Sequence, residues 1–248
     1  MIVDTHAHLN TEDYQEDLED VLIRSKMNDV NQIIVIGMDE ETNLKAIELA
    51  EEHDMLFATV GVHPGYVDNQ TTDHLESLLN KKKVVAIGEC GIDLHWRQDN
   101  YELQRSIFIE QIELAKRFKL PLVIHTRSSF EEAYQCLVSS KGKVTGVFHC
   151  FSSNLKDAKR AIDLGFYIGI DGPITFKKAE DLVDIVEHLI GVKNYSEIYF
   201  HGISLGANMI LKYLGERNEV PSQVKGVVAV SVPCDLNSSC NELHAFKN

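Results

Sequence analysis

Imidazole and carboxylate side chains recur at the ends of short apolar runs along the first two thirds of the chain. The set consists of His6, His8, His63, Glu89, Asp93, His125 and His149. Imidazole nitrogens and carboxylate oxygens are common protein ligands of divalent cations, and two such cations can activate a water and neutralise a phosphodiester. These residue types therefore predict a metal-dependent hydrolytic site, if the fold brings them together.

The spacing within this set carries information of its own. His6 and His8 are two residues apart, so on an extended strand both project to the same side and can share one cation. Glu89 offers two carboxylate oxygens and can bridge two cations. A single histidine at a strand end is more often a hydrogen-bonded core residue than a ligand. Packing does not readily explain the whole set at successive strand ends, which favours metal binding.

Short β-branched runs alternate with helical stretches up to about residue 190. The predicted strands are Ile2–Asp4, Gln32–Gly37, Leu56–Val60, Val84–Gly88, Leu122–His125, Val144–His149 and Phe166–Ile170, with amphipathic segments such as Thr42–His53 and Tyr101–Lys119 between them. This alternation predicts parallel βαβ units, whose carboxyl ends converge on one face of a barrel. The predicted fold class is α/β, an incomplete (β/α)8 TIM-type barrel of about seven βα units. A doubly wound open sheet is the alternative.

Composition indicates a globular domain. The chain has 248 residues, of which 44% are hydrophobic and 25% charged, values typical of globular domains. No apolar run reaches the roughly 18 residues that a membrane span needs, and the N-terminus lacks a signal-type segment, so we expect a cytoplasmic protein. The five cysteines form no C-x-x-C pair, and we expect them to be reduced thiols rather than a disulfide framework.

The charge is strongly acidic and unevenly distributed. Residues 191–248 carry equal numbers of acidic and basic side chains, so the whole net charge of -14 belongs to residues 1–190. An acidic surface repels nucleic acid at long range. Nuclease activity would therefore depend on a local metal site, and the change in composition near residue 190 suggests a seam.

Six segments, taken in order, resemble the TatD family of metal-dependent deoxyribonucleases. They are Asp4–Leu9, Gly61–Pro64, Gly88–Asp93, Pro121–His125, Phe148–Phe151 and Gly172–Lys177. The resemblance covers about three quarters of the chain and implies a barrel fold that hydrolyses DNA, at ends or in single strands, with divalent cations. It implies that His6 and His8 hold one metal, that Glu89 bridges, and that His125 and His149 hold the second. His63 and Asp93 match positions that contact substrate or orient ligands.

The resemblance favours Mg²⁺ as the cation, with Mn²⁺ or Zn²⁺ as alternatives. The family also carries an Asp within a Glu-Thr-Asp-Ser-Pro motif at the end of its eighth strand, where it binds the first metal. That motif is absent here, and the residues at the corresponding position are Tyr199–Gly202. His201 at this point cannot accept a proton from water once it binds a metal. One complete cation site and impaired turnover are therefore expected.

A different pattern begins where the barrel motifs stop. Gly202, Ser204 and Gly206 form a G-x-S-x-G sequence between a predicted strand at Glu197–Phe200 and a predicted helix at Leu205–Leu214. This is the nucleophile-elbow pattern, and residues 195–240 resemble an internal fragment of an α/β-hydrolase esterase or lipase. A further strand is predicted at Val227–Val232. Neither an oxyanion loop nor a suitably placed acid and histidine accompanies Ser204, which we interpret as a relic nucleophile.

The sequence therefore predicts two parts. Residues 1–190 form a truncated TatD-like hydrolase barrel, and residues 191–248 form an incomplete α/β-hydrolase-like fragment, so that the chain is interpreted as a chimera or fusion. The predicted function is metal-dependent hydrolysis of DNA, impaired by the missing strand-8 Asp. The alternatives are a non-catalytic hybrid that binds metal and a serine esterase acting through Ser204.

Overall fold

The computed structural model describes residues 2–171, 180–192, 198–203, 222 and 224–230. The chain divides into two compact units. The first, here called the barrel unit, comprises residues 1–151 and 156–169, and the second, the C-terminal unit, comprises residues 152–155 and 170–248. The predicted boundary near residue 190 stays a prediction.

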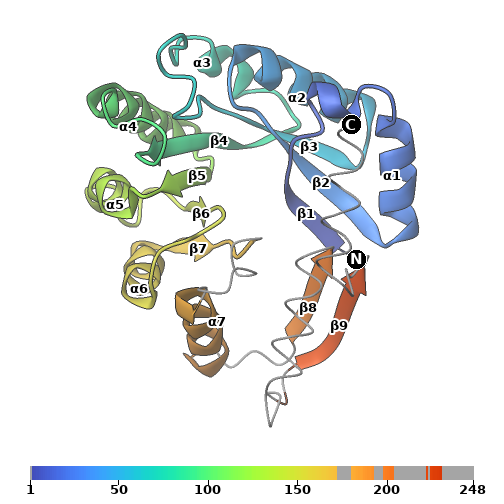
Figure 1. Cartoon of the computed structure of the whole chain (residues 1–248). Coiled ribbons are helices and arrows are strands. Elements are labelled where there is room, and N and C mark those ends of the chain that lie inside the picture. Colours follow the sequence, from blue (N-terminus) through green and yellow to red (C-terminus); the bar gives the residue numbers. More distant parts are fainter. Residues whose placement is uncertain (1, 172–179, 193–197, 204–221, 223, 231–248) are drawn as a thin grey trace, which may run out of the picture. The chain divides into compact units, whose positions relative to one another are not determined.

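The barrel unit is built on one seven-stranded parallel sheet whose strands follow one another in sequence order. Its strands are β1 (Ile2–Ala7), β2 (Val30–Ile36), β3 (Leu56–Val60), β4 (Val84–Asp93), β5 (Leu122–Arg127), β6 (Gly146–Phe148) and β7 (Phe166–Ile168). The sheet curls as it passes from β1 to β7 (Figure 1). All seven predicted strands are present, and the predicted incomplete barrel of seven βα units is confirmed.

Helices connect these strands and lie on the outer side of the curled sheet (Figure 1). They are the short 3-10 helix η1 (Glu12–Tyr14) and the helices α1 (Leu18–Met27), α2 (Glu40–Glu52), α3 (Leu75–Leu78), α4 (Tyr101–Phe118), α5 (Phe130–Val138) and α6 (Leu155–Leu164). Helix α2 begins at a capping box, in which the Asp39 carboxylate accepts from the Thr42 N–H and the Thr42 hydroxyl accepts from the Asp39 N–H, satisfying two otherwise unpaired donors. No helix in the described part of the chain is long and apolar enough to cross a membrane.

The core lies on both faces of the sheet. Consecutive strand residues such as Val35 and Ile36 in β2 are both fully buried, because one points toward the inside of the curl and the other toward the helices. Phe108 from α4 and Phe148 from β6 are also fully buried. This two-sided burial explains why the strands read as continuous apolar runs in the sequence and not as alternating ones.

The C-terminal unit contains helix α7 (Glu180–Val192) and two parallel strands, β8 (Ile198–Ile203) and β9 (Val224–Val230). These strands pair with each other in a sheet separate from that of β1–β7. The two strands predicted in this region are thus present, although β8 extends further and β9 begins earlier than predicted. The predicted helix at Leu205–Leu214 lies outside the described residues.

Three buried side-chain amides hold the backbone at the carboxyl ends of β3 and β4. Asn43 exchanges two hydrogen bonds with the backbone of Gly61, at 2.9 and 3.0 Å. Gln111 does the same with Val62, at 2.9 and 3.0 Å, and Gln104 with Asp93, at 2.8 and 3.1 Å. Each amide makes the two hydrogen bonds that a neighbouring strand would otherwise make. It thereby satisfies a buried backbone N–H and C=O group beyond the last strand-to-strand hydrogen bonds.

Replacing Gln111 by leucine should destabilise the fold, because it leaves the buried N–H and C=O of Val62 without partners. At about 1–3 kcal/mol for each of the two unsatisfied groups, we expect the free energy of unfolding to fall by about 2–6 kcal/mol. Urea titration monitored by circular dichroism measures this change. The matched control is Gln135→Leu on the exposed face of α5, which should change stability by less than about 0.5 kcal/mol. Equal stability of the two variants would contradict the assigned role of Gln111.

Candidate metal centre

The seven residues predicted for the hydrolytic site all belong to the barrel unit and lie at the carboxyl ends of its strands. His6 lies in β1 and His8 just after it, His63 follows β3, Glu89 and Asp93 lie in β4, His125 lies in β5, and His149 follows β6. Because the strands are parallel, these ends meet at one edge of the sheet. The fold therefore brings together side chains that are separated by up to 143 positions in the sequence.

Glu89 lies at the centre of this cluster and is only 4% exposed. Its Oε2 atom is 3.4 Å from Nε2 of His6 and 3.9 Å from Nε2 of His8. Its Oε1 atom is 2.9 Å from Nδ1 of His125 and 4.0 Å from Nε2 of His63. Each carboxylate oxygen thus faces its own pair of imidazoles, which is the arrangement expected of a carboxylate that bridges two cations.

The donor atoms around Oε2 suit a single cation. His6 Nε2 and His8 Nε2 are 3.2 Å apart, and each is within 3.9 Å of Glu89 Oε2. Two ligand atoms that are each about 2.1 Å from one cation lie roughly 3.0–3.6 Å apart at the angles of about 90–120° found in four- to six-coordinate sites. The His6–His8 and His6–Glu89 spacings fall in this range, and the His8–Glu89 spacing is slightly longer. The nitrogen and oxygen donor set therefore fits a divalent metal in both chemistry and spacing.

His149 belongs to the same side of the cluster as His6. The two rings stack with centroids 3.4 Å apart and planes 6° from parallel, and His6, Glu89 and His149 each offer a ligand atom within 4.8 Å of the others. A second such group consists of His63, Glu89 and His125. The assignment of His149 to the second cation, together with His125, stays a prediction.

Hydrogen bonds distinguish the two imidazoles that face Oε1. The backbone N–H of Gly65 donates to Nδ1 of His63 at 3.0 Å, so the neutral ring carries its proton on Nε2. An Nε2–H group is a hydrogen-bond donor and offers no lone pair to a cation. This hydrogen bond makes Nε2 of His63 a donor toward Glu89, and the role of His63 as a substrate contact stays a prediction.

Asp93 orients His125 and the loop that follows β4. Its Oδ2 atom is 3.0 Å from Nε2 of His125, which turns Nδ1 of that ring toward Glu89. Its Oδ1 atom accepts hydrogen bonds from the backbone N–H groups of His95 and Trp96, at 2.9 and 3.3 Å. A carboxylate behind a histidine ligand commonly fixes the tautomer and the ring orientation, which supports the predicted orienting role of Asp93.

Two glycines allow β4 and β5 to approach closely beside Glu89. Gly88 and Gly91 have φ angles of +145° and +140°, a region that other residues rarely adopt. A Cβ atom on Gly91 would lie 2.0 Å from the carbonyl oxygen of His125, and one on Gly88 would lie 2.5 Å from that of Val123. The glycines of the Gly88–Asp93 segment are therefore required by the backbone that carries the central carboxylate.

The charge of the two carboxylates is maintained by their surroundings. Burial alone would raise the pKa of Glu89, but hydrogen bonds from His125 and His6 and the nearby imidazoles outweigh it and hold the pKa well below its ordinary value. Burial also opposes ionisation of Asp93, yet the His125 hydrogen bond and the two backbone N–H groups lower its pKa. Both groups are thus anionic at neutral pH, as a cation site requires.

The imidazoles differ in protonation. Burial lowers the pKa of His63 to about 4, and burial together with the neighbouring His6 lowers that of His8, so both rings are neutral at physiological pH. Burial also acts to lower the pKa of His125, but the hydrogen bonds to Glu89 and Asp93 prevail and raise it. A cation binds only the neutral form of this ring, so acidic pH should oppose metal binding.

Two cysteines of the barrel unit, Cys90 and Cys136, form no disulfide within the described part of the chain. Cys90 follows Glu89 directly but is fully buried, and burial raises the pKa of its thiol far above the ordinary range. A thiol in this state is not a nucleophile at neutral pH. Cys234 and Cys240 lie outside the described residues.

The second predicted constellation is not covered by the structure. Ser204 and Gly206 lie outside the described residues, whereas Gly202 and His201 belong to β8 of the C-terminal unit. The nucleophile-elbow interpretation therefore stays a prediction.

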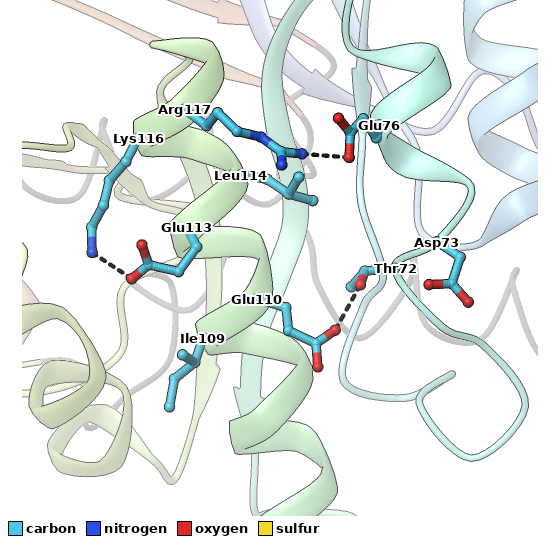
Figure 2. Close-up of a pocket in the computed structure, with 9 residues that line it drawn as sticks. All are labelled: Thr72, Asp73, Glu76, Ile109, Glu110, Glu113, Leu114, Lys116 and Arg117. Atoms are coloured by element: carbon cyan, nitrogen blue, oxygen red, sulfur yellow. Dashed lines mark hydrogen bonds and ion pairs between the residues drawn. The ribbon is translucent and has the colours of Figure 1, made fainter.

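A groove of about 700 Å³ lies on the outer helical layer and contains none of the site residues. It runs along the second half of α4 and the start of α3, and it is lined mainly by charged side chains (Figure 2). Many of these are paired with one another: Arg117 with Glu76, Lys116 with Glu113, and Glu110 with the Thr72 hydroxyl. The groove is therefore a surface feature of the helical layer, and Glu110 within it is a carboxylate remote from the cluster around Glu89.

Sequence comparison matches residues 3–193 to the family described as "TatD related DNase". Two similar curated proteins are the uncharacterized metal-dependent hydrolase YabD of Bacillus subtilis and YjjV of Escherichia coli. YabD is 38% identical over 193 residues, which cover 76% of each chain. YjjV is 35% identical over 192 residues, which cover 75% of this chain and 74% of YjjV. These comparisons give no support to the α/β-hydrolase likeness of residues 195–240.

Solved structures show the same similarity in three dimensions. The crystal structure of the TatD homologue YjjV from Escherichia coli superimposes with a TM-score of 0.68 and 33% identity, covering 75% of this chain and 73% of YjjV. A TatD family hydrolase from Entamoeba histolytica superimposes with a TM-score of 0.66 and 27% identity, covering 75% and 69%. The similarity in fold thus covers about three quarters of the chain, as the similarity in sequence does.

Glu89→Gln should abolish tight binding of divalent metal, because the amide keeps the shape of the side chain but lacks its charge. Changes to residues that only support metal ligands cost about 10–100-fold in affinity, so we expect a loss of more than about 100-fold here. Calorimetric titration of Mn²⁺ into the full chain measures it. The control Glu110→Gln removes a carboxylate from the groove of Figure 2 and should bind like the unmutated chain. Equal affinity of both variants would refute the central role of Glu89.

Proposed function

The chain belongs to the TatD-related DNase family, and on that premise we propose that it hydrolyses phosphodiester bonds of DNA with divalent cations held around Glu89. One observation carries the proposal. The two oxygens of the buried Glu89 carboxylate face two separate sets of imidazoles, so that one side chain can serve two cations. A pair of cations is the usual means of stabilising both the attacking and the leaving oxygen of a phosphodiester.

The cations, when bound, would supply Lewis-acid activation of water and neutralise the phosphate charge. Glu89 remains anionic for this purpose and holds His6 and His8 in place. Asp93 fixes the ring of His125 through Nε2, so that Nδ1 is available beside Oε1. His63 presents an Nε2–H donor toward the same space, where it can bind a phosphate oxygen of the substrate.

The proposed substrate is DNA, either at its ends or in single strands. The net charge of -14 opposes binding along a broad surface, since most non-specific affinity for nucleic acid comes from basic residues that displace counterions. Recognition should therefore be confined to the few nucleotides next to the cluster. This restriction favours frayed ends and single strands over intact duplex.

We propose Mg²⁺ as the physiological cation, with Mn²⁺ and Zn²⁺ to be tested beside it. Mg²⁺ prefers oxygen ligands, whereas imidazole nitrogens suit Zn²⁺ and other transition metals. The cluster contains both kinds of donor, so direct comparison of the three ions is informative.

Turnover in this chain should be impaired relative to a chain with the family's strand-8 Asp. The residues at the corresponding position are Tyr199–Gly202, within β8 of the C-terminal unit. With His149 assigned to the second cation, the first cation has three protein donors, from His6, His8 and Glu89, and it lacks the family's Asp, which can accept a proton from water. The interpretation of residues 191–248 as a foreign segment belongs to this proposal.

The purified full chain should cleave single-stranded DNA slowly in Mg²⁺ or Mn²⁺, and EDTA should abolish the cleavage. Asp93→Asn should lower kcat/KM about 10–100-fold, because it weakens the support of His125 without removing a ligand. Gel analysis of an end-labelled oligonucleotide measures both effects. Cleavage that survives EDTA, or equals the unmutated rate in Glu89→Gln, would exclude a metal-dependent mechanism at this site.

Restoring the family's ending should raise both activity and stability. The comparison replaces residues 191–248 by a TatD-type segment with Thr-Asp-Ser-Pro and sets this protein beside the original chain. The restored protein should melt at a higher temperature, because an intact barrel has no free sheet edge, and should cleave DNA at least about tenfold faster, since the added Asp supplies a metal ligand. Equal melting temperatures and rates would show that residues 191–248 are a genuine part of the enzyme.

A further inference from the structure

An exposed aromatic ring and a cation lie together at the carboxyl ends of β4 and β5. Trp96, in the loop after β4, is 72% exposed, which is unusual for the largest apolar side chain in a protein. The Arg127 guanidinium lies over its ring, 5.2 Å from the centroid. The exposed area leaves the indole open to a further flat partner.

Arg127 differs from the other arginines in the described part of the chain. Arg24, Arg97, Arg105, Arg117 and Arg160 each lie within 4.0 Å of a carboxylate. Arg127 is exposed, and no carboxylate among the described residues forms an ion pair with it. An unpaired guanidinium in so acidic a chain is available to an anionic ligand, and its planar fork suits phosphate oxygens.

Trp96 is linked to the metal centre through Asp93, and Arg127 through its place on β5. One oxygen of that carboxylate accepts the backbone N–H of Trp96, and the other bonds to His125. Arg127 follows His125 by two positions on β5, so the two side chains project to the same side of the strand, with Cα atoms about 6.6 Å apart. This distance is about the length of one nucleotide in an extended strand.

We propose that Trp96 and Arg127 form a nucleotide-binding platform, on which an unpaired base of the DNA substrate stacks against the indole while Arg127 binds an adjacent phosphate. The proposal rests on the proposed function and specifies which nucleotide the site holds. The bound nucleotide is next to the phosphodiester that lies at Glu89. Trp96 and Arg127 are therefore positioning residues for the substrate.

The platform accounts for a preference for single strands without sequence selectivity. Every base has a flat face that stacks on an aromatic ring, so stacking tolerates any sequence. A base in a duplex is already stacked on both sides and is not free to cover the indole. One arginine supplies a local cation where the chain as a whole repels DNA.

Trp96 is the sole tryptophan of the chain, and its fluorescence therefore reports on this site alone. The experiment titrates short oligothymidylate into the full chain at low salt with EDTA, so that no cleavage occurs. We expect saturable quenching of the tryptophan emission. An abasic oligomer of equal length and charge should produce little quenching, because it carries phosphates but no base to stack.

Variants separate the two roles, with affinity measured by anisotropy of a labelled oligothymidylate. Trp96→Leu should weaken binding about 5- to 100-fold, and Trp96→Phe should restore most of it, since a ring replaces a ring. Arg127→Ala should reduce the slope of log affinity against log salt by about 0.7, the value for one phosphate contact on a single strand. Trp96→Leu should leave that slope unchanged. Tyr167→Leu removes a different side chain that is also 72% exposed and serves as the control.

Calorimetric binding of Mn²⁺ by Trp96→Leu, together with its melting temperature, verifies that the variant is folded. Equal quenching by the abasic oligomer, or unchanged affinity in folded Trp96→Leu, would overturn the platform. The proposed function is judged separately by cleavage. Metal-dependent cleavage without quenching would contradict the proposed platform and support the proposed nuclease activity. Quenching by oligothymidylate without any metal-dependent cleavage would support the platform and contradict the nuclease activity.

Discussion

A buried carboxylate is stable only if its charge is compensated, and the barrel unit is organised around that requirement at Glu89. Transfer of an unpaired carboxylate from water into a protein interior costs several kcal/mol. Glu89 is 4% exposed and is surrounded by imidazoles from other strands. Hydrogen bonds from the rings of His125 and His6 contribute to this compensation. Divalent cations would provide it more completely, which links metal binding to the stability of the site.

The backbone around Glu89 is as constrained as its charge. Gly88 and Gly91 let β4 lie against β5 at distances that no Cβ would permit. Buried amides from the helices then hold the strand ends, with Gln104 on Asp93 and Gln111 on Val62. Preorganisation of this kind keeps the ligands in position before a cation or substrate arrives.

The net charge of the chain and the charge of the site should act on DNA in opposite ways. The chain as a whole is acidic, so that encounter with DNA is not assisted at long range. The proposed attraction for DNA comes from the cluster at Glu89, through the cations that it would hold, and from Arg127, with which no carboxylate among the described residues forms an ion pair. Such a protein would bind DNA weakly except where an accessible strand reaches the site, and its specificity would follow from access to the strand and not from base sequence.

The sequence by itself determined the seven strands and the candidate ligands. Parallel strands buried on both faces appear as short apolar runs, and polar residues at their ends stand out from that background. The partners of each oxygen of Glu89, the proton position on His63 and the pairing of Trp96 with Arg127 were decided only by the tertiary structure. The contacts of Glu89 and the Trp96–Arg127 pair join residues that are 26 to 83 positions apart, and their geometry depends on strand register, glycine backbone angles and single hydrogen bonds. None of these leaves a periodic signal in the chain.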